Sequence, residues 1–259
     1  MAQTPSSDNL YLGKGALYFD RFDSTGAKTG ELHLGNVDNF TISTEDEKAE
    51  MYESMTKSAG LYKQALKKRT ISLKGKLYEF TQDNLALFTM GTTGTFSQTS
   101  GTVSSAETLT SSSKQGRYYA TAKRGISTTV LVSGTSTPYT SRTLGTDYSV
   151  DAATGRIYVI PGGGIVDGHT AQLSSYAYST LALKTIAGGT ESQVIGFLRF
   201  IGDPSAGPAQ EYQFWKCDVT PDGELGLIGD DYGSFGIGFK LLSDSAAHPT
   251  EPYYKQFFL

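Results

Sequence analysis

Apolar and polar residues alternate along several stretches of the chain, and this period of two predicts β-strands. Residues 70–80 place Ile71, Leu73 and Leu77 on one face and two lysines on the other. Residues 193–203 are almost continuously apolar, which is typical of a strand covered on both faces. Further strands are predicted over 14–22, 31–44, 209–223 and 224–244. The pattern therefore favours a mainly β protein.

One segment departs from the two-residue period and predicts a short helix. Thr81 can cap the free amides that precede the sequence QDNLALFTM, and Asp83 suits the positive end of the helix dipole. Gly91 ends the helix. Its apolar residues form one stripe, so the helix needs a sheet to cover.

Serine, threonine and glycine make up 18 of the 25 residues from 89 to 113, which predicts a flexible connector. Strand-like runs separated by turn signals resume between residues 116 and 179. Segment 95–180 carries six cations and four anions, a charge of +2, whereas the remaining chain carries 16 cations and 22 anions, a charge of −6. We therefore predict a small inserted β-domain over 95–180, within a larger domain formed by 1–94 and 181–259.

Residues 43–69 differ from the strands on either side, because their charges are divided between the two ends of the segment. The acidic part contains Glu45, Asp46, Glu47, Glu50 and Glu53, and the basic part contains Lys57, Lys63, Lys67, Lys68 and Arg69. Met51 and Met55 would supply adaptable apolar contacts. A connecting segment of this length is usually functional or disordered.

Three structures are open for this segment. A helix over 44–67 is favoured by the capping-box pair Thr44 and Glu47, but Gly60 in its middle costs ~1 kcal/mol relative to alanine. An extended arm could not easily pair its acidic part with its own basic part. Each part would then pair with the opposite part of an adjacent copy, in head-to-tail contacts. A solvated surface loop is the third. We predict that the twelve charged and methionine residues named above form an inter-subunit contact, which matters for assembly and hardly for the fold.

The composition excludes several classes of function. The net charge of −4 gives no general attraction to nucleic acid or to an anionic membrane. A single cysteine excludes an intramolecular disulfide and suits a reducing cytoplasm. The first ten residues lack the features of a signal peptide, and no stretch approaches the ~20 apolar residues of a membrane helix. We expect a soluble protein made in the cytoplasm.

Reactive residues do not converge on a recognisable motif. The three histidines lack metal-ligand spacing, and Cys217 alternates in phase with Trp215, as a buried residue of a strand would. Only Glu211 and Asp218 could form the paired carboxylates of a β-sandwich hydrolase. We therefore expect no enzyme activity and no catalytic, cofactor-binding or metal-binding residues.

The order of these parts resembles a major tail tube protein of a long-tailed bacteriophage. The resemblance lies in GNVDNFTIST, the charged segment, KKRTISLKGKLYEFTQDNLALFTMG and VTPDGELGLIGDDYGSFGIGFKLLSD, and it covers roughly 1–94 and 181–259. The sequence GTDYSVDAATGRIYVIPGGGIVDG is similar to immunoglobulin-like or β-sandwich modules inserted in phage virion proteins.

This resemblance implies a tail-tube β-barrel or sandwich flanked by one short helix, with an inserted small β-sandwich domain. Six copies would form a ring, rings would stack into a hollow tube in the virion tail, and residues 43–69 would reach across rings. The implied partners are a tape-measure protein and the tail terminator and distal tail proteins, with no cofactor and no membrane. Genomic DNA would pass without specific binding, which the charge of −6 suits, because phosphate contacts would arrest sliding. The alternative is a phage or bacterial adhesin whose tyrosines stack on sugars.

Overall fold

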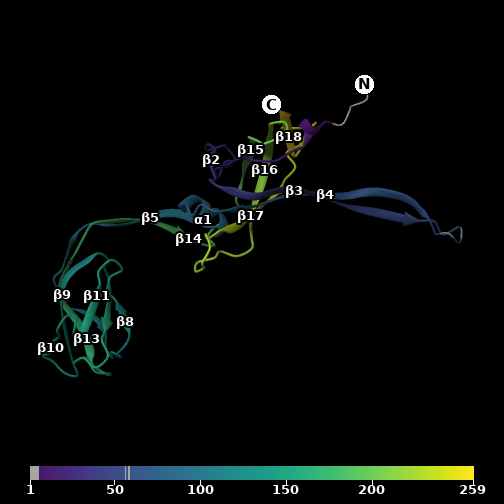
Figure 1. Ribbon diagram of the computed structural model, residues 1–259. Helices are drawn as coiled ribbons and strands as arrows, with labels where there is room; N and C mark the ends of the chain where they lie inside the picture. Colours follow the sequence, from purple (N-terminus) through teal and green to yellow (C-terminus); the bar gives the residue numbers. More distant parts are fainter. Residues whose placement is uncertain (1–5, 56, 58) are drawn as a thin grey trace. The chain divides into compact units, whose positions relative to one another are not determined.

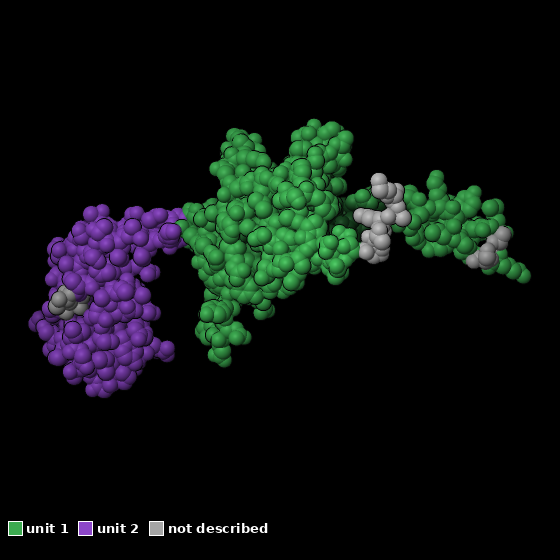
Figure 2. All heavy atoms as spheres, turned by 45° about the horizontal axis from the view of Figure 1, so that its top comes forward, with its two compact units in different colours: residues 1–93, 186–259 green, residues 94–185 purple. Residues whose placement is uncertain are grey.

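The computed structural model describes residues 6–55, 57 and 59–259, apart from the side chains of residues 128 and 129. The chain divides into two compact units, which Figure 2 colours separately. Unit 1 comprises residues 1–93 and 186–259, and unit 2 comprises residues 94–185. Unit 2 is formed from the segment in which the sequence predicts an inserted domain, 95–180. That this segment folds independently stays a prediction.

Strands dominate both units, so the prediction of a mainly β protein is confirmed (Figure 1). Unit 1 contains a short 3-10 helix, Ser7–Asn9, and the helix α1, Gln82–Phe88. Its sheet contains β1 (Gly15–Arg21), β2 (Leu32–His33), β3 (Val37–Tyr52), β4 (Leu61–Leu77), β15 (Ile195–Gly202), β16 (Gln210–Asp222), β17 (Phe235–Leu241) and β18 (Tyr254–Phe258). Two further strands, β5 (Thr92–Gln98) and β14 (Leu181–Ala187), form a separate two-stranded sheet, and most of their residues belong to unit 2.

The unit 1 sheet is open, with the strand order β2-β1-β15-β16-β17-β4-β3. Every pairing in it is antiparallel. The long strand β16 pairs with β18 over its first half and with β17 over its second half. Within the described residues the strand pairing closes no barrel. β2 and β3 end the main strand order, and β18, which pairs only with β16, is a further edge strand.

The core of unit 1 lies on one face of this sheet. Residues directly opposite each other on paired strands share a face, and Phe19 lies opposite Leu198, which lies opposite Phe214. On the other side of β16, Phe239 lies opposite Leu73. All five side chains are buried in one cluster. The alternation that predicted these strands therefore identified the buried face.

Helix α1 packs against this face of the sheet. The Thr81 side chain accepts a hydrogen bond from the Asn84 backbone amide at 3.1 Å, as the sequence predicts for the N-cap. The helix ends at Phe88, three residues before Gly91. The Asn84 side chain is buried and donates to the Leu34 carbonyl oxygen at 2.9 Å, which fixes the helix to the chain that precedes β3. The predicted helix is thus confirmed.

Unit 2 is a β-sandwich. One sheet has the order β10-β9-β13-β6, with β7 also paired to β13, and the other has the order β11-β12-β8. Its core cluster combines side chains of both sheets, such as Leu173 from the first and Ile157 from the second. Its strands are β6 (Gly101–Val103), β7 (Glu107–Thr110), β8 (Tyr118–Ala120), β9 (Ile126–Gly134), β10 (Thr140–Ser141), β11 (Tyr148–Asp151), β12 (Arg156–Val159) and β13 (Thr170–Tyr178).

The prediction of a flexible connector over 89–113 is wrong, because this segment contributes β5, β6 and β7. Its small polar residues suggested a linker, but many of them are threonines. Threonine is β-branched and favours the extended backbone of a strand.

Candidate assembly surface

The hairpin formed by β3 and β4 continues past the rest of unit 1, and we call residues 43–69 the arm (Figure 1). At its base, Thr44 and Arg69 line a shallow depression together with Tyr253 and Tyr254. Beyond the base, the described side chains of the arm are exposed, except for Ala49 and Glu53, which are half-buried. The arm is therefore a two-stranded ribbon with two open faces.

Of the three structures left open for this segment, the helix over 44–67 is wrong, because the arm continues the antiparallel ladder of the sheet. Asp46 pairs with Arg69, and Ala49 pairs with Ala65. Near its outer end the Glu53 amide donates to the Gly60 carbonyl oxygen at 2.7 Å. The inner part of β4 is fixed by β17, so each further pair extends an existing ladder, whereas a helix needs an unfavourable nucleus of its own. Residues 56 and 58, which also belong to the predicted arm, lie outside the described residues.

The acidic and basic parts of the arm face each other within one copy. Asp46 accepts two hydrogen bonds from Arg69, from Nε to Oδ1 and from Nη2 to Oδ2, both at 2.8 Å. These hydrogen bonds, and then the positive charge of Arg69, lower the pKa of Asp46. Lys67 lies 3.8 Å from Glu47. The expectation that an extended arm cannot satisfy its own charges is therefore wrong for these pairs, because the hairpin turns back and places acids opposite bases.

The other predicted contact residues occupy both faces of the ribbon. Glu50 accepts hydrogen bonds from the Tyr52 hydroxyl at 2.7 Å and from the Gln64 side-chain amide at 3.0 Å. The remaining predicted residues are placed by register or by chain position: Glu45 opposite Thr70, Lys68 opposite Glu47, Lys63 opposite Met51, and Glu53, Met55 and Lys57 between the two strands. That these residues contact another subunit stays a prediction.

Large apolar side chains of the arm are exposed on both strands. They are Met51, Tyr52, Met55, Leu61, Tyr62 and Leu66, and Met55 is 79% exposed. An isolated two-stranded hairpin is marginally stable in water, and contiguous exposed apolar groups usually mark a contact site. Of these six residues, only the two methionines are among the contact residues predicted from the sequence. A second surface against the ribbon would supply the burial that the arm lacks.

The edge strand β3 offers a further contact. It pairs only with β4 among the described residues, so its other side presents unpaired backbone amide and carbonyl groups. Such an edge is a template for pairing with another chain. The strand is 16 residues long, which is well above the usual length of about 5 to 6.

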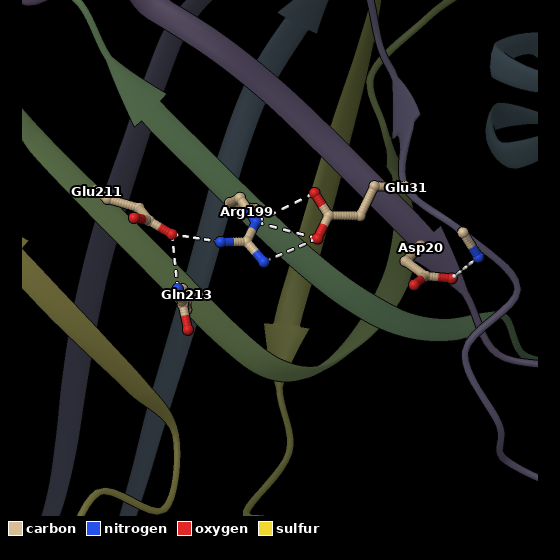
Figure 3. A network of polar contacts seen from close by, with 6 residues as sticks. Asp20, Glu31, Arg199, Glu211 and Gln213 are labelled. Carbon is tan, nitrogen blue, oxygen red and sulfur yellow. Dashed lines mark hydrogen bonds and ion pairs between the residues drawn. The ribbon is translucent and has the colours of Figure 1, made fainter.

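The carboxylates considered for a hydrolase do not meet. Glu211 and Asp218 are seven positions apart on β16, which separates them by roughly 20 Å along the strand. A glycosidase pair needs a separation of about 5 to 10 Å. Figure 3 shows Glu211 engaged with Arg199 and Gln213, while Arg199 also binds Glu31. In this network Glu211 joins β16 to β15 and, through Arg199, to the segment before β2.

Asp20 anchors the same segment from β1. Its carboxylate accepts hydrogen bonds from the Thr29 and Gly30 amides, both at 2.8 Å.

Cys217 is fully buried, and this burial raises the pKa of its thiol. Within the part of the chain that the structure describes, no group of three or more His, Cys, Asp or Glu side chains could hold a metal ion. No described helix is long and apolar enough to cross a membrane.

The family described as "Protein of unknown function UCP028589" matches residues 10–258, so the chain belongs to this family. The matched region runs through both units. A search of curated proteins found no match.

Proposed function

We propose that this family member is a structural subunit of a bacteriophage tail, which polymerises into stacked six-membered rings around a hollow tube. The observation that carries the proposal is the arm, a long ribbon with exposed apolar side chains on both strands. Such a ribbon is stable and protected from non-specific association when a second copy covers it. In the tube, the arm of one ring packs against the next ring.

The open sheet of unit 1 supports lateral contacts within a ring. β2 and β3, at the two ends of its strand order, have unpaired backbone groups in the described structure, and β3 is long. Two different edges that meet give a head-to-tail contact, and such contacts close into rings when the rotation between copies divides a full turn. The number six comes from the resemblance and is part of the proposal.

The face of this sheet opposite the core supports the role of a conduit. Over β4 and β17 this face carries polar and small residues, among them Lys74, Lys240, Gly236 and Gly238, and Asp222 lies 3.0 Å from Lys74. The charge of −6 outside segment 95–180 gives no net attraction for phosphate. We propose that this face lines the tube, where DNA slides without being held.

Removal of the arm tests the proposal. A variant that lacks residues 46–66 keeps the buried core cluster, so we expect a folded monomer with the wild-type melting temperature of unit 1 and no tubes. Negative-stain electron microscopy of concentrated protein measures tube formation, and the fluorescence of Trp215 reports the fold of unit 1. An exposed leucine of unit 2 provides the control, because Leu144→Asp should leave tubes intact. Tubes of normal appearance from the deletion variant would contradict the proposal.

An adhesin is the second candidate, and one observation on unit 2 favours it. Tyr118 and Tyr158 lie opposite each other on β8 and β12, with ring centroids 4.7 Å apart, and Tyr118 is exposed. An exposed tyrosine ring backed by a second, half-buried tyrosine suits stacking against a sugar ring. Arg156 lies over the Tyr118 ring, however, and occupies part of that surface. Binding to a glycan array that is lost in Tyr118→Ala, by a protein that forms no rings or tubes, would favour this candidate.

A further inference from the structure

A second apolar surface of unit 1 lies outside the arm, in the loop between β16 and β17. We call residues 223–234 the acidic loop, because it contains Glu224, Asp230 and Asp231 and no cation. Its large apolar side chains are almost wholly exposed: Leu227 is 82%, Ile228 is 100% and Tyr232 is 96% exposed. The contact proposed for the arm does not involve these residues. The sequence predicts only a turn at this place and gives no sign of the exposed patch.

The base of the acidic loop is anchored although its tip is bare. Leu225 packs against the core cluster, and Gly233 approaches the Phe80 ring so closely that a Cβ there would lie 2.9 Å from it. Single exposed apolar residues are common, but three within six residues on an anchored loop form a patch. The loop therefore presents a fixed apolar knob to solvent.

Unit 1 also contains a cavity of complementary character. A pocket of about 330 Å³ lies at the end of the core face near the N-terminal segment, and we call it the aromatic pocket. Its walls include Tyr11, Leu17, Phe40, Ile42, Phe200 and Tyr212. Phe200 lies between Phe40 and Tyr212, with ring centroids 5.9 Å and 6.2 Å away.

Lys14 offers the acidic loop a partner at the aromatic pocket. Lys14 lines the pocket and has no ion pair among the described residues. Asp38 also lines the pocket and accepts hydrogen bonds from the uncharged amides of Asn39, so the lining holds one cation and one anion. The attraction to the three acids of the loop is therefore local to Lys14.

We propose that the acidic loop of one copy inserts Leu227 and Ile228 into the aromatic pocket of a second copy, with Asp230 and Asp231 near Lys14. The tip is exposed in its own copy, so it does not fill its own pocket. A knob and a pocket on different surfaces of one molecule make a head-to-tail contact, which propagates from copy to copy. This contact goes beyond the proposed function, because it needs neither the arm nor a tube.

Substitution at the tip of the loop tests the knob. Ile228→Asp replaces a fully exposed side chain, so the fold should be unchanged, and we expect the self-association constant to fall about 10-fold or more. Sedimentation velocity over a range of concentrations measures this constant. Leu144→Asp, on unit 2, is the matched control and should change it less than about twofold. An Ile228→Asp protein that associates like wild type overturns the proposal.

A charge exchange tests the pocket. Lys14→Glu and the pair Asp230→Lys with Asp231→Lys should each weaken association, and the combined variant should recover part of it. Weakening by the loop variants without any effect of Lys14→Glu and without recovery overturns the assignment of the pocket.

Paired cysteine substitutions identify which segment occupies the aromatic pocket. Oxidation of a chain with Ile228→Cys and Ile42→Cys should give a ladder of covalent oligomers, because the two positions meet between copies. A ladder from Met55→Cys with Ile42→Cys, and none from the first pair, would assign the pocket to the arm and overturn the proposal.

Electron microscopy of the Ile228→Asp variant separates this inference from the proposed function. Normal tubes combined with unchanged association overturn the inference alone. Wild-type protein that associates through the acidic loop but never forms rings or tubes overturns the proposed function alone.

Discussion

The inner and outer halves of the β3–β4 hairpin belong to one antiparallel ladder, which has register shifts in both halves, but they are held by different forces. In the inner half, Leu73 and Leu77 are fully buried and β17 pairs with β4. In the outer half, the arm, β4 pairs only with β3 among the described residues, and Asp46–Arg69 is a solvated ion pair. Hydrophobic burial is worth far more than an exposed ion pair.

The inner half of the hairpin serves the fold, and the outer half serves the proposed assembly. The inner half contributes to the core of unit 1, so its sequence is constrained by packing within the copy. The outer half contributes little to that core, so its exposed apolar residues are explained by a surface supplied from outside the copy.

The largest contrast should appear in side-chain truncation. Leu73→Ala removes a fully buried side chain and should lower the free energy of unfolding of unit 1 by about 2 to 5 kcal/mol. Leu66→Ala, the matched truncation in the arm, should change it by less than about 0.5 kcal/mol, because Leu66 is exposed. Urea unfolding followed by Trp215 fluorescence measures both, since Trp215 is the only tryptophan and lies in unit 1. Equal losses would show that the arm belongs to the folding core.

Hydrogen exchange should show the same division along the backbone. Amides of the inner half should open only with unit 1 as a whole, and those of the arm should be about 100-fold or more less protected in the monomer. Assembly should raise protection in the arm and leave the inner half unchanged. Peptide-resolved exchange on monomer and assembled protein measures this. Full protection of the arm in the monomer would contradict the need for a covering copy.

Charge reversal distinguishes pairing within a copy from pairing between copies. Reversal of Lys67, Lys68 and Arg69 to Glu should weaken the arm and reduce assembly, because Asp46 and Glu47 lose their partners. Reversal of Glu45, Asp46 and Glu47 to Lys in the same chain should restore both. A mixture of two proteins, one with only the basic residues reversed and one with only the acidic residues reversed, should not regain assembly. In neither protein do the two strands of the arm carry opposite charges. Efficient co-assembly of the mixture, measured by light scattering and microscopy, would show that the charges pair between copies after all.

The buried part of the fold could be predicted from the sequence because buried positions recur at regular intervals as apolar residues. Phe235, Ile237 and Phe239 alternate with small residues and identified β17, and Thr81 with Gly91 identified α1. In each case local propensity and tertiary contacts favour the same structure.

The arm could not be predicted because its residues are exposed and leave no such period. Its acidic part contains four glutamates and two methionines, which favour a helix locally, yet the ladder started by the inner half determines the backbone. The acidic loop was missed for a related reason. Leu227 and Ile228 stand among glycines and acids, and only the folded structure reveals that they are exposed among the described residues.

The smallest expected effect is the response of the arm to acid. In the folded state Asp46 accepts hydrogen bonds from Arg69, and these bonds lower the pKa of Asp46. The positive charge of Arg69 lowers it further. The Asp46–Arg69 pair therefore stabilises the arm fully above the unfolded pKa of about 3.9. This stabilisation is lost as pH falls through the lower folded pKa. Because both groups are solvated, we expect local loosening of the arm below about pH 4, with the inner half unaffected. The Met51 methyl NMR signal, opposite Lys63 in the ribbon, measures this loosening, and Arg69→Gln should abolish the part of the titration that is due to the pair.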